Sequence, residues 1–173
     1  MVAAAVILPE KFRHRKLKDS KQLLPELRQE IYDELVSRDD IIWSIGVVDS
    51  FEIDQINILR ATHKAMRFAL EGLCGPPDHV LIDGLPVSPF PLPQTAIIDG
   101  DCISLSIAAA SVIAKVTRDR LMREFCARFP SIVSASTKVT APNFTSSNFM
   151  NTGLVRSIAD LSSRWRNRFS RSN

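Results

Sequence analysis

The chain has 173 residues, of which 45% are hydrophobic and 24% charged, and its formal net charge at pH 7 is +3. This length and composition suffice for one hydrophobic core and are short for two, which argues against a multidomain protein. The charge is uneven, because residues 1–130 hold 16 Lys+Arg and 18 Asp+Glu, whereas residues 131–173 hold 6 and 1. The basic balance therefore comes from the C-terminal segment, and it does not by itself indicate a nucleic-acid surface on the body.

The cysteines and the first apolar run bear on where the protein is found. Cys74, Cys102 and Cys126 are odd in number and far apart, with no C-x-x-C pair, which favours a reduced, cytoplasmic protein. Residues 1–8 are apolar, but they lack a positively charged leader and are too few to span a bilayer. We therefore interpret this run as a strand and expect no membrane association.

The first quarter of the chain predicts two strands separated by a basic segment and a helix. We expect strands over residues 2–8 and 41–48, and a helix over residues 25–37 with proline in its first turn. Between the first strand and the helix, Lys11 to Lys21 holds six cationic side chains and one acidic side chain. This segment is either a solvated loop or a contact for a nucleic-acid backbone, and its charge leaves both interpretations open.

A longer helix is expected over residues 54–73. Its apolar residues recur at steps of three and four, which is typical of a helix with one buried face. His63 lies in this apolar stripe, and no second His or Cys stands at a ligand spacing. We interpret His63 as a packed or half-exposed residue rather than as a metal ligand.

Two short apolar runs, residues 79–84 and 95–101, each end in an aspartate beside a glycine. Runs without polar alternation suit strands that are buried on both faces of a parallel sheet. Ligand sites of open α/β sheets lie at the carboxyl ends of the strands, so Asp83 and Asp101 are expected to be near neighbours. The sequence therefore predicts a metal-site geometry at this edge. Four prolines in the connecting segment predict an extended, ordered loop.

A helix rich in small residues is expected to follow, with Ser106 as its N-cap. Ser111, Lys115 and Asp119 are spaced by four residues and would share one face of this helix. One interpretation of this pattern is a surface ion pair, and we interpret Asp119 as structural.

Several of these segments, in this order and with this spacing, resemble bacterial ribonuclease HII from about Val2 to Pro130. The segments that carry the resemblance are Leu17 to Leu23, Glu52 to Leu59, Val80 to Gly84 and Ser106 to Asp119. The resemblance implies an α/β, ribonuclease H-like fold, in which helices flank a mixed β-sheet. It also implies an endonuclease that uses Mn²⁺ or Mg²⁺ to cleave the RNA strand of RNA-DNA hybrids.

The resemblance assigns roles to individual residues. Asp83 matches the family's third carboxylate and Asp101 its fourth, so both are expected to be catalytic metal ligands. Ser20, Lys21, Ser111 and Lys115 are expected to contact nucleic acid. The implied partner is an RNA-DNA hybrid or a DNA duplex with embedded ribonucleotides, and we expect a monomer.

The chain also departs from the family pattern at both ends. The family's adjacent Asp-Glu pair and its first central strand precede the part that this chain matches, and its Gly-Tyr-Gly element is not found after Pro130. We therefore expect a partial ribonuclease H-like domain over residues 1–130 and a divergent, disordered tail over residues 131–173, introduced by a frameshift after about Phe129. The two carboxylates Asp83 and Asp101 are too few for two metal ions, so this form is expected to be inactive or truncated and to fold poorly alone. Two alternatives stay open: a catalytically dead binder of hybrid duplexes, and an unrelated α/β protein that binds a small molecule.

Overall fold

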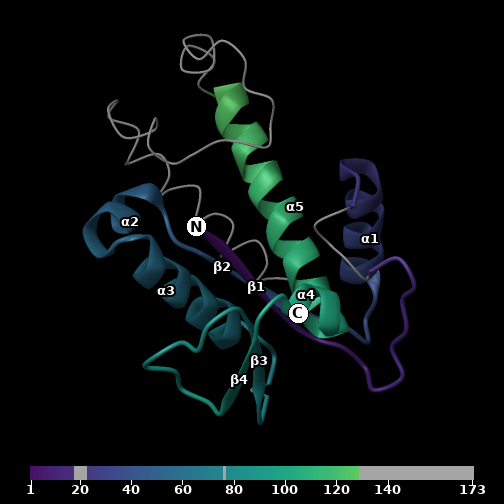
Figure 1. Ribbon diagram of the computed structural model, residues 1–173. Coiled ribbons are helices and arrows are strands. Elements are labelled where there is room, and N and C mark those ends of the chain that lie inside the picture. The colour runs from purple at the N-terminus through teal and green to yellow at the C-terminus, as the bar shows by residue number, and fades with distance from the viewer. Residues whose placement is uncertain (18–22, 76, 129–173) are drawn as a thin grey trace.

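The computed structural model of the protein describes residues 1–17, 23–75 and 77–128. These residues form both helices and strands, as Figure 1 shows. The elements in chain order are β1 (Val2–Ile7), α1 (Pro25–Ser37), β2 (Ile42–Val47), α2 (Ser50–Ile56), α3 (Ile58–Glu71), β3 (Val80–Asp83), β4 (Gln94–Ile97), α4 (Gly100–Ile103) and α5 (Leu105–Arg128). The expected tail, residues 131–173, lies outside the described residues, so the proposed boundary near residue 130 stays a prediction.

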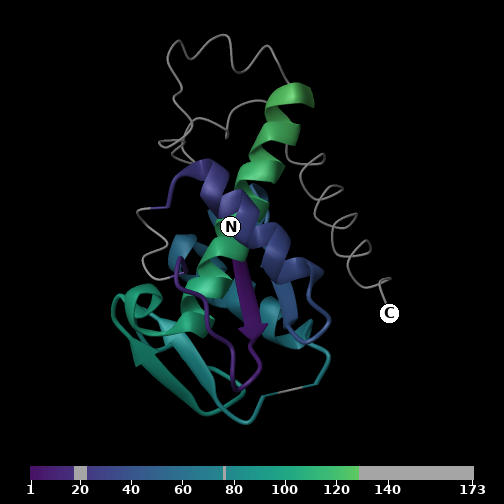
Figure 2. The ribbon, with the colours of Figure 1, turned by 90° about the vertical axis from the view of Figure 1, so that its right-hand side faces the viewer.

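The strands β1 and β2 form an antiparallel pair with Val2 opposite Val47 and Ile7 opposite Ile42. One face of this pair packs on α3, where Ala3 of β1 lies with Ala61 and Ala65. The other face packs on α5 and α1, and Val2 contacts the cluster of Leu121 and Phe125 there. Helices therefore cover both faces of β1 and β2, as Figures 1 and 2 show from two sides.

The strands β3 and β4 form a separate, parallel pair, so the described part of the chain holds two two-stranded sheets of opposite kind. The mixed α/β architecture that the sequence predicted is confirmed. The expectation that both runs are buried on both faces is wrong, because Leu81 is 42% exposed and Ile98, just after β4, is 72% exposed. The outer face of this small sheet has no covering helix among the described residues.

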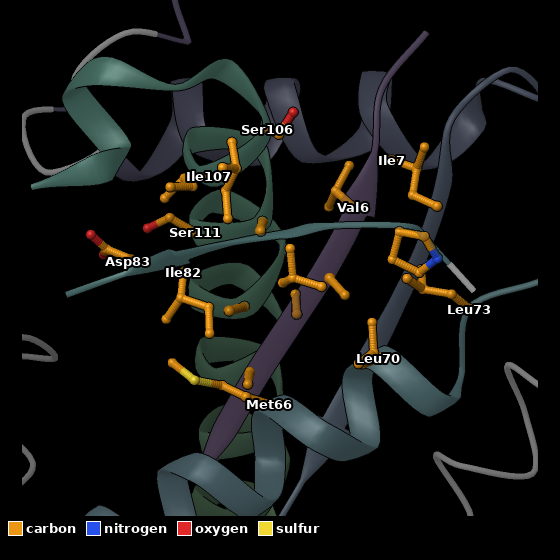
Figure 3. A pocket seen from close by; sticks show the side chains of 18 of the residues that line it. Val6, Ile7, Met66, Leu70, Leu73, Ile82, Asp83, Ser106, Ile107 and Ser111 are labelled. Atoms are coloured by element: carbon orange, nitrogen blue, oxygen red, sulfur yellow. The ribbon is translucent and has the colours of Figure 1, made fainter. Parts of the chain in front are cut away.

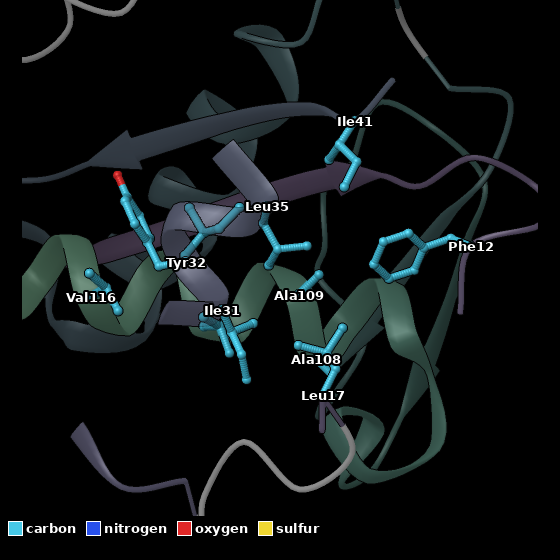
Figure 4. Packing of buried hydrophobic residues seen from close by; sticks show 11 residues of the cluster. Phe12, Leu17, Ile31, Tyr32, Leu35, Ile41, Ala108, Ala109 and Val116 are labelled. Carbon is cyan, nitrogen blue, oxygen red and sulfur yellow. The ribbon is translucent and has the colours of Figure 1, made fainter. Parts of the chain in front are cut away.

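The main hydrophobic core lies between α1, α5 and the β1–β2 pair. The buried residues of α5 in this cluster are Ala108, Ala109, Val112, Ile113 and Val116, and Figure 4 shows α1 contributing Ile31, Tyr32 and Leu35. Small side chains on α5 let the helix approach the sheet closely, while larger ones fill the space toward α1. This packing fixes α5 as the central helix, which also carries the candidate residues Ser111 and Lys115.

Two local expectations from the sequence are wrong. The helix expected over residues 54–73 is divided into α2 and α3 at Asn57, whose φ is 68° and whose side chain accepts a hydrogen bond from the Arg60 N–H. The positive φ of Asn57 breaks the helical path and its side chain caps the new helix, so this residue interrupts an otherwise continuous apolar stripe. The helix α5 begins one residue before Ser106, and the hydroxyl of Ser104 lies 3.5 Å from the Ile107 nitrogen in the capping position.

Within the described residues, no helix is both long enough and apolar enough to cross a membrane.

Candidate functional site

Two hydrogen bonds connect the carboxyl end of β3 with the end of β4 and the residues that follow it. Asp83, the last residue of β3, accepts a hydrogen bond through Oδ1 from the Gly100 N–H at 2.9 Å, and the Gly84 N–H donates to the Ile97 carbonyl at 2.9 Å. Gly100 is buried, and a Cβ atom at this position would lie 2.6 Å from Ile107 Cδ1 and 3.4 Å from Asp83 Oδ1. A larger residue at this position would therefore require the end of the Ile107 side chain to move, whereas its contact with Asp83 would be an ordinary one.

Asp101 follows Gly100 directly and lies in the first turn of the short helix α4. Its side chain is only 1% exposed, which is unusual for a carboxylate. The sequence placed Asp101 at the end of a strand, and this detail is wrong because β4 ends at Ile97. Asp99 adopts a left-handed conformation with φ of 51°, and this turn directs the chain from β4 into α4. The two predicted carboxylates thus lie on β3 and α4, and the hydrogen bond from Gly100 to Asp83 links these two elements.

A cavity of about 440 Å³ opens beside Asp83. It lies between β1 and β3, and its walls come from α3 on one side and α5 on the other, as Figure 3 shows. Most of its lining is apolar, including Val6, Met66, Leu70 and Ile82. The hydroxyl-bearing residues Ser106 and Ser111 line the cavity together with Asp83. We did not predict this cavity from the sequence. The sequence gives only a slight indication of it, because the small residues Ala110 and Ala114 of α5 leave space at one wall.

Two of the four residues that we expected to contact nucleic acid, Ser111 and Lys115, lie in the described part of the chain. Ser111 lines the same cavity as Asp83, whereas Lys115 is half-buried one helical turn further along α5. Asp119 lies 3.5 Å from Arg28, so an ion pair connects α5 to α1. Ser20 and Lys21 lie outside the described residues. Their contact with nucleic acid, like the ligand role of the two aspartates, stays a prediction.

The donor set at this site suits a hard divalent cation. Carboxylate oxygens are the ligands that Mg²⁺ and Mn²⁺ prefer, and Mg²⁺ is often held by one or two carboxylates together with water and substrate phosphates. Within residues 1–17, 23–75 and 77–128, no group of three or more His, Cys, Asp or Glu side chains could hold a metal ion. The described residues therefore hold no carboxylate cluster of the size that two ions need, and a role of Asp83 and Asp101 as ligands of one divalent ion stays a prediction.

The fold was compared with solved structures. The chain resembles the crystal structure of the ribonuclease H2 from Pyrococcus horikoshii OT3, with a TM-score of 0.62 and 21% sequence identity, over 99% of this chain and 100% of that chain. The architecture, with Asp83 at the end of β3 and Asp101 in α4, is thus a ribonuclease H-like α/β fold. The sequence model of the ribonuclease HII family matches residues 1–168. The chain belongs to the ribonuclease HII family, and the match extends beyond residue 130, into the segment that we expected to be divergent.

Individual relatives agree with this assignment. The ribonuclease HII of Geotalea uraniireducens is 48% identical over 138 residues, which make up 80% of this chain and 63% of that protein. The ribonuclease HII of Myxococcus xanthus is 46% identical over 138 residues, and these cover 80% of this chain and 47% of that protein. The chain thus spans about half to two thirds of the length of these curated relatives.

Proposed function

We propose that this chain acts on RNA-DNA hybrids as a metal-dependent endonuclease of the ribonuclease HII type, with Asp83 and Asp101 as metal ligands. The observation that carries the proposal is the pairing of Asp83 with the amide of Gly100, the residue before the buried Asp101. Membership of the ribonuclease HII family supports the same substrate, a hybrid or a DNA duplex with embedded ribonucleotides.

Some residues of the site would supply charge for the metal ion and the phosphates, and others would position these charged groups. A bound Mg²⁺ or Mn²⁺ ion supplies activation of water and stabilisation of the leaving oxygen. The Gly100 amide fixes the orientation of the Asp83 carboxylate, and burial of Asp101 restricts its rotamers. Ser111 offers a hydroxyl beside Asp83, and Lys115 supplies a cation on the same helix, both suited to a phosphate of the nucleic-acid backbone. Ser20 and Lys21 would add contacts to the backbone. We also propose that the protein is cytoplasmic and monomeric.

The activity of this chain alone is expected to be weak or absent. Two carboxylates fit one ion, whereas in-line phosphodiester hydrolysis by two ions requires a larger set of carboxylates. This observation favours a second candidate function, in which the chain binds hybrid duplexes and does not cleave them. Binding would then depend on salt, because contacts with phosphates release counterions.

A cleavage and binding assay on one hybrid duplex separates these functions. We would incubate the full chain with an end-labelled RNA-DNA hybrid in Mn²⁺ or Mg²⁺, beside the variants Asp83→Asn and Asp101→Asn. Cleavage that disappears in both variants would support the nuclease. Salt-dependent binding of the hybrid without cleavage would support the second function. If the chain neither binds nor cleaves the hybrid in either metal, both proposals are wrong.

A further inference from the structure

The connection between β3 and β4 begins next to the candidate ligand Asp83, and the proposed function gives it no role. The two strands are parallel neighbours, which Figure 1 shows side by side. Residues 84–93 join them, and none of these residues, all of which the structure describes, is helical. Parallel strands usually need a connection of about a dozen residues or more, which commonly contains a helix. This connection is therefore short, and contacts other than those of a helix must fix its path.

Val87, near the middle of the connection, is only 2% exposed. A buried backbone N–H or C=O without a partner costs free energy, so both groups of Val87 need partners. The side chain of Gln94, the first residue of β4, supplies them. The Val87 N–H donates to Gln94 Oε1 at 2.9 Å, and Gln94 Nε2 donates to the Val87 carbonyl at 2.6 Å. One amide side chain thus holds the middle of the connection against the strand that follows it.

The pair of hydrogen bonds requires a particular side chain at position 94. Only Asn and Gln carry an N–H donor and a carbonyl acceptor on one carbon atom, and Asn is shorter by one methylene group. An ionised Glu could accept from the Val87 N–H but could not donate to the Val87 carbonyl. The chemistry at this position can therefore be tested by small changes of the side chain.

The chain leaves Asp83 through a segment that β4 holds at both of its ends. Gly84, the next residue, has a φ of 92°, and its N–H donates to the Ile97 carbonyl at 2.9 Å. Val87, at the other end of the segment, is held by Gln94. Gln94 and Ile97 are the first and last residues of β4. The path of the backbone just after Asp83 is therefore fixed relative to one strand.

The direction of the Asp83 carboxylate depends on this path. Asp83 is exposed, and its Oδ1 accepts a hydrogen bond from the Gly100 N–H at 2.9 Å. An exposed side chain keeps one rotamer only when its contacts offset the lost conformational entropy, so both partners of this hydrogen bond must be held in place. Groups that hold a metal ligand in its orientation typically change metal affinity by about ten- to hundredfold when they are removed.

We propose that Gln94 is a positioning residue of the metal site. By holding Val87, it fixes the backbone that leaves Asp83 and thereby the direction of the Asp83 carboxylate. Gln94 acts through Asp83 and needs no contact with metal or substrate. The inference rests on the proposed function, in which Asp83 is a metal ligand. The main core is built from α1, α5 and the β1–β2 pair, so loss of the Gln94 amide should leave it intact.

Three variants of the full chain test this role. Gln94→Leu removes both hydrogen bonds to Val87 and keeps a side chain of similar size. Gln94→Glu keeps the acceptor for the Val87 N–H but has no donor when it is ionised. Thr95→Val is the matched control on the same strand. It removes a different side-chain contact, in which Thr95 Oγ1 lies 2.8 Å from His79 Nε2, and preserves the branched shape of the side chain.

The first measurement is the affinity for Mn²⁺ in calorimetric titrations. We expect Gln94→Leu to weaken Mn²⁺ binding by about tenfold or more, and Gln94→Glu to weaken it by a smaller factor. Thr95→Val should leave the affinity unchanged, because its hydroxyl does not contact the connection.

The second measurement is hydrogen exchange of single amides by NMR, without metal. The Gly100 N–H donates to Asp83, so its exchange rate reports whether the carboxylate stays in place. We expect Gly100 to exchange about tenfold faster or more in Gln94→Leu, as after loss of one or two hydrogen bonds. The amide of Ile113, which is 0% exposed in the main core, should exchange at an unchanged rate.

Four outcomes overturn the proposal. Unchanged Mn²⁺ affinity of Gln94→Leu would show that the carboxylate keeps its place without the amide. Equal acceleration of exchange at Gly100 and Ile113 would show that Gln94 only stabilises the fold. An effect of Thr95→Val as large as that of Gln94→Leu would show a general loss of β4. Absence of Mn²⁺ binding by the unchanged chain would overturn the proposed ligand role of Asp83 as well, and this failure is distinguished by its appearance without any substitution.

Discussion

The Asp83 carboxylate accepts a hydrogen bond from the backbone N–H of Gly100 at 2.9 Å, although the two residues are 17 positions apart and β4 lies between them in the chain. This contact joins the end of β3 to the start of α4 and places Asp101 next to the residue that binds Asp83. The loop between them is also ordered by a side chain, because Gln94 donates to the Val87 carbonyl and accepts from the Val87 N–H. The two candidate ligands are therefore linked through the backbone.

Substitutions at Asp83 should separate its structural role from its charge. Asp83→Asn retains an oxygen that can accept from Gly100 but loses the negative charge, whereas Asp83→Ala loses both. We expect both variants to lose Mn²⁺ binding in calorimetric titrations. Only Asp83→Ala should also lose stability, by about 1 kcal/mol in urea unfolding, the usual contribution of one hydrogen bond. Undiminished Mn²⁺ binding by Asp83→Asn would contradict a ligand role for this carboxylate.

Gly46 of β2 should tolerate no larger residue. A Cβ atom there would lie 1.9 Å from the Ala65 carbonyl oxygen and 2.7 Å from the Ala69 nitrogen, both in the backbone of α3. Because neither atom can rotate away, Gly46→Ala must push α3 from the sheet, and we expect a loss of about 3 kcal/mol or more in urea unfolding.

Gly72→Ala serves as the control for Gly46→Ala. Its Cβ atom would meet the Ser44 hydroxyl at 2.1 Å, and this side chain can change its rotamer. We expect a smaller loss of stability than for Gly46→Ala. Equal losses in the two variants would show that contact with the backbone of α3 is not the limiting factor.

Ile113 tests the importance of the packing around α5. The residue is 0% exposed and belongs to the core cluster between α1, α5 and the sheet. Ile113→Ala would leave a cavity, and we expect a loss of about 2–5 kcal/mol in the free energy of unfolding. The matched control, Ile98→Ala, is at a position that is 72% exposed and should change stability by about 0.5 kcal/mol or less. A loss below that of the control would show that α5 does not pack as described.

The N-terminal amine should make stability depend on pH. Burial lowers the pKa of the Met1 amine below its usual value of 8.0, and nearby Asp49 opposes this change in part. Between the lowered pKa and 8.0, the unfolded chain binds more protons than the folded one, so stability rises with pH in this window and levels off above it.

Acetylation of the N-terminus isolates this effect. The acetylated chain keeps an N–H that can donate to the Val48 carbonyl but has no charge to desolvate. We expect thermal unfolding of the acetylated chain to lose the pH dependence that is specific to this window. Equal pH dependence of the acetylated and free chains would contradict the assignment to Met1.

The sequence by itself determined most of the local structure. The apolar runs at residues 2–8 and 41–48 predicted β1 and β2, and the two runs that end near Asp83 and Asp101 predicted β3 and β4. A short apolar run that is bounded by turn residues is a local signal of a strand, so it can be recognised from the sequence alone. The motifs around Asp83 and Ser106 also indicated the ribonuclease HII family, which the comparisons confirm.

Only the tertiary structure decided how these elements combine. The separation of β1–β2 from β3–β4, the exposure of one face of β3, and the cavity between β1 and β3 all depend on pairing between segments far apart in the chain. A local pattern cannot reveal such pairing, because the same apolar run can pair on one edge or on both. The contact of Asp83 with Gly100 likewise depends on the path of the loop between them, and the sequence predicted proximity but not the atom that establishes it.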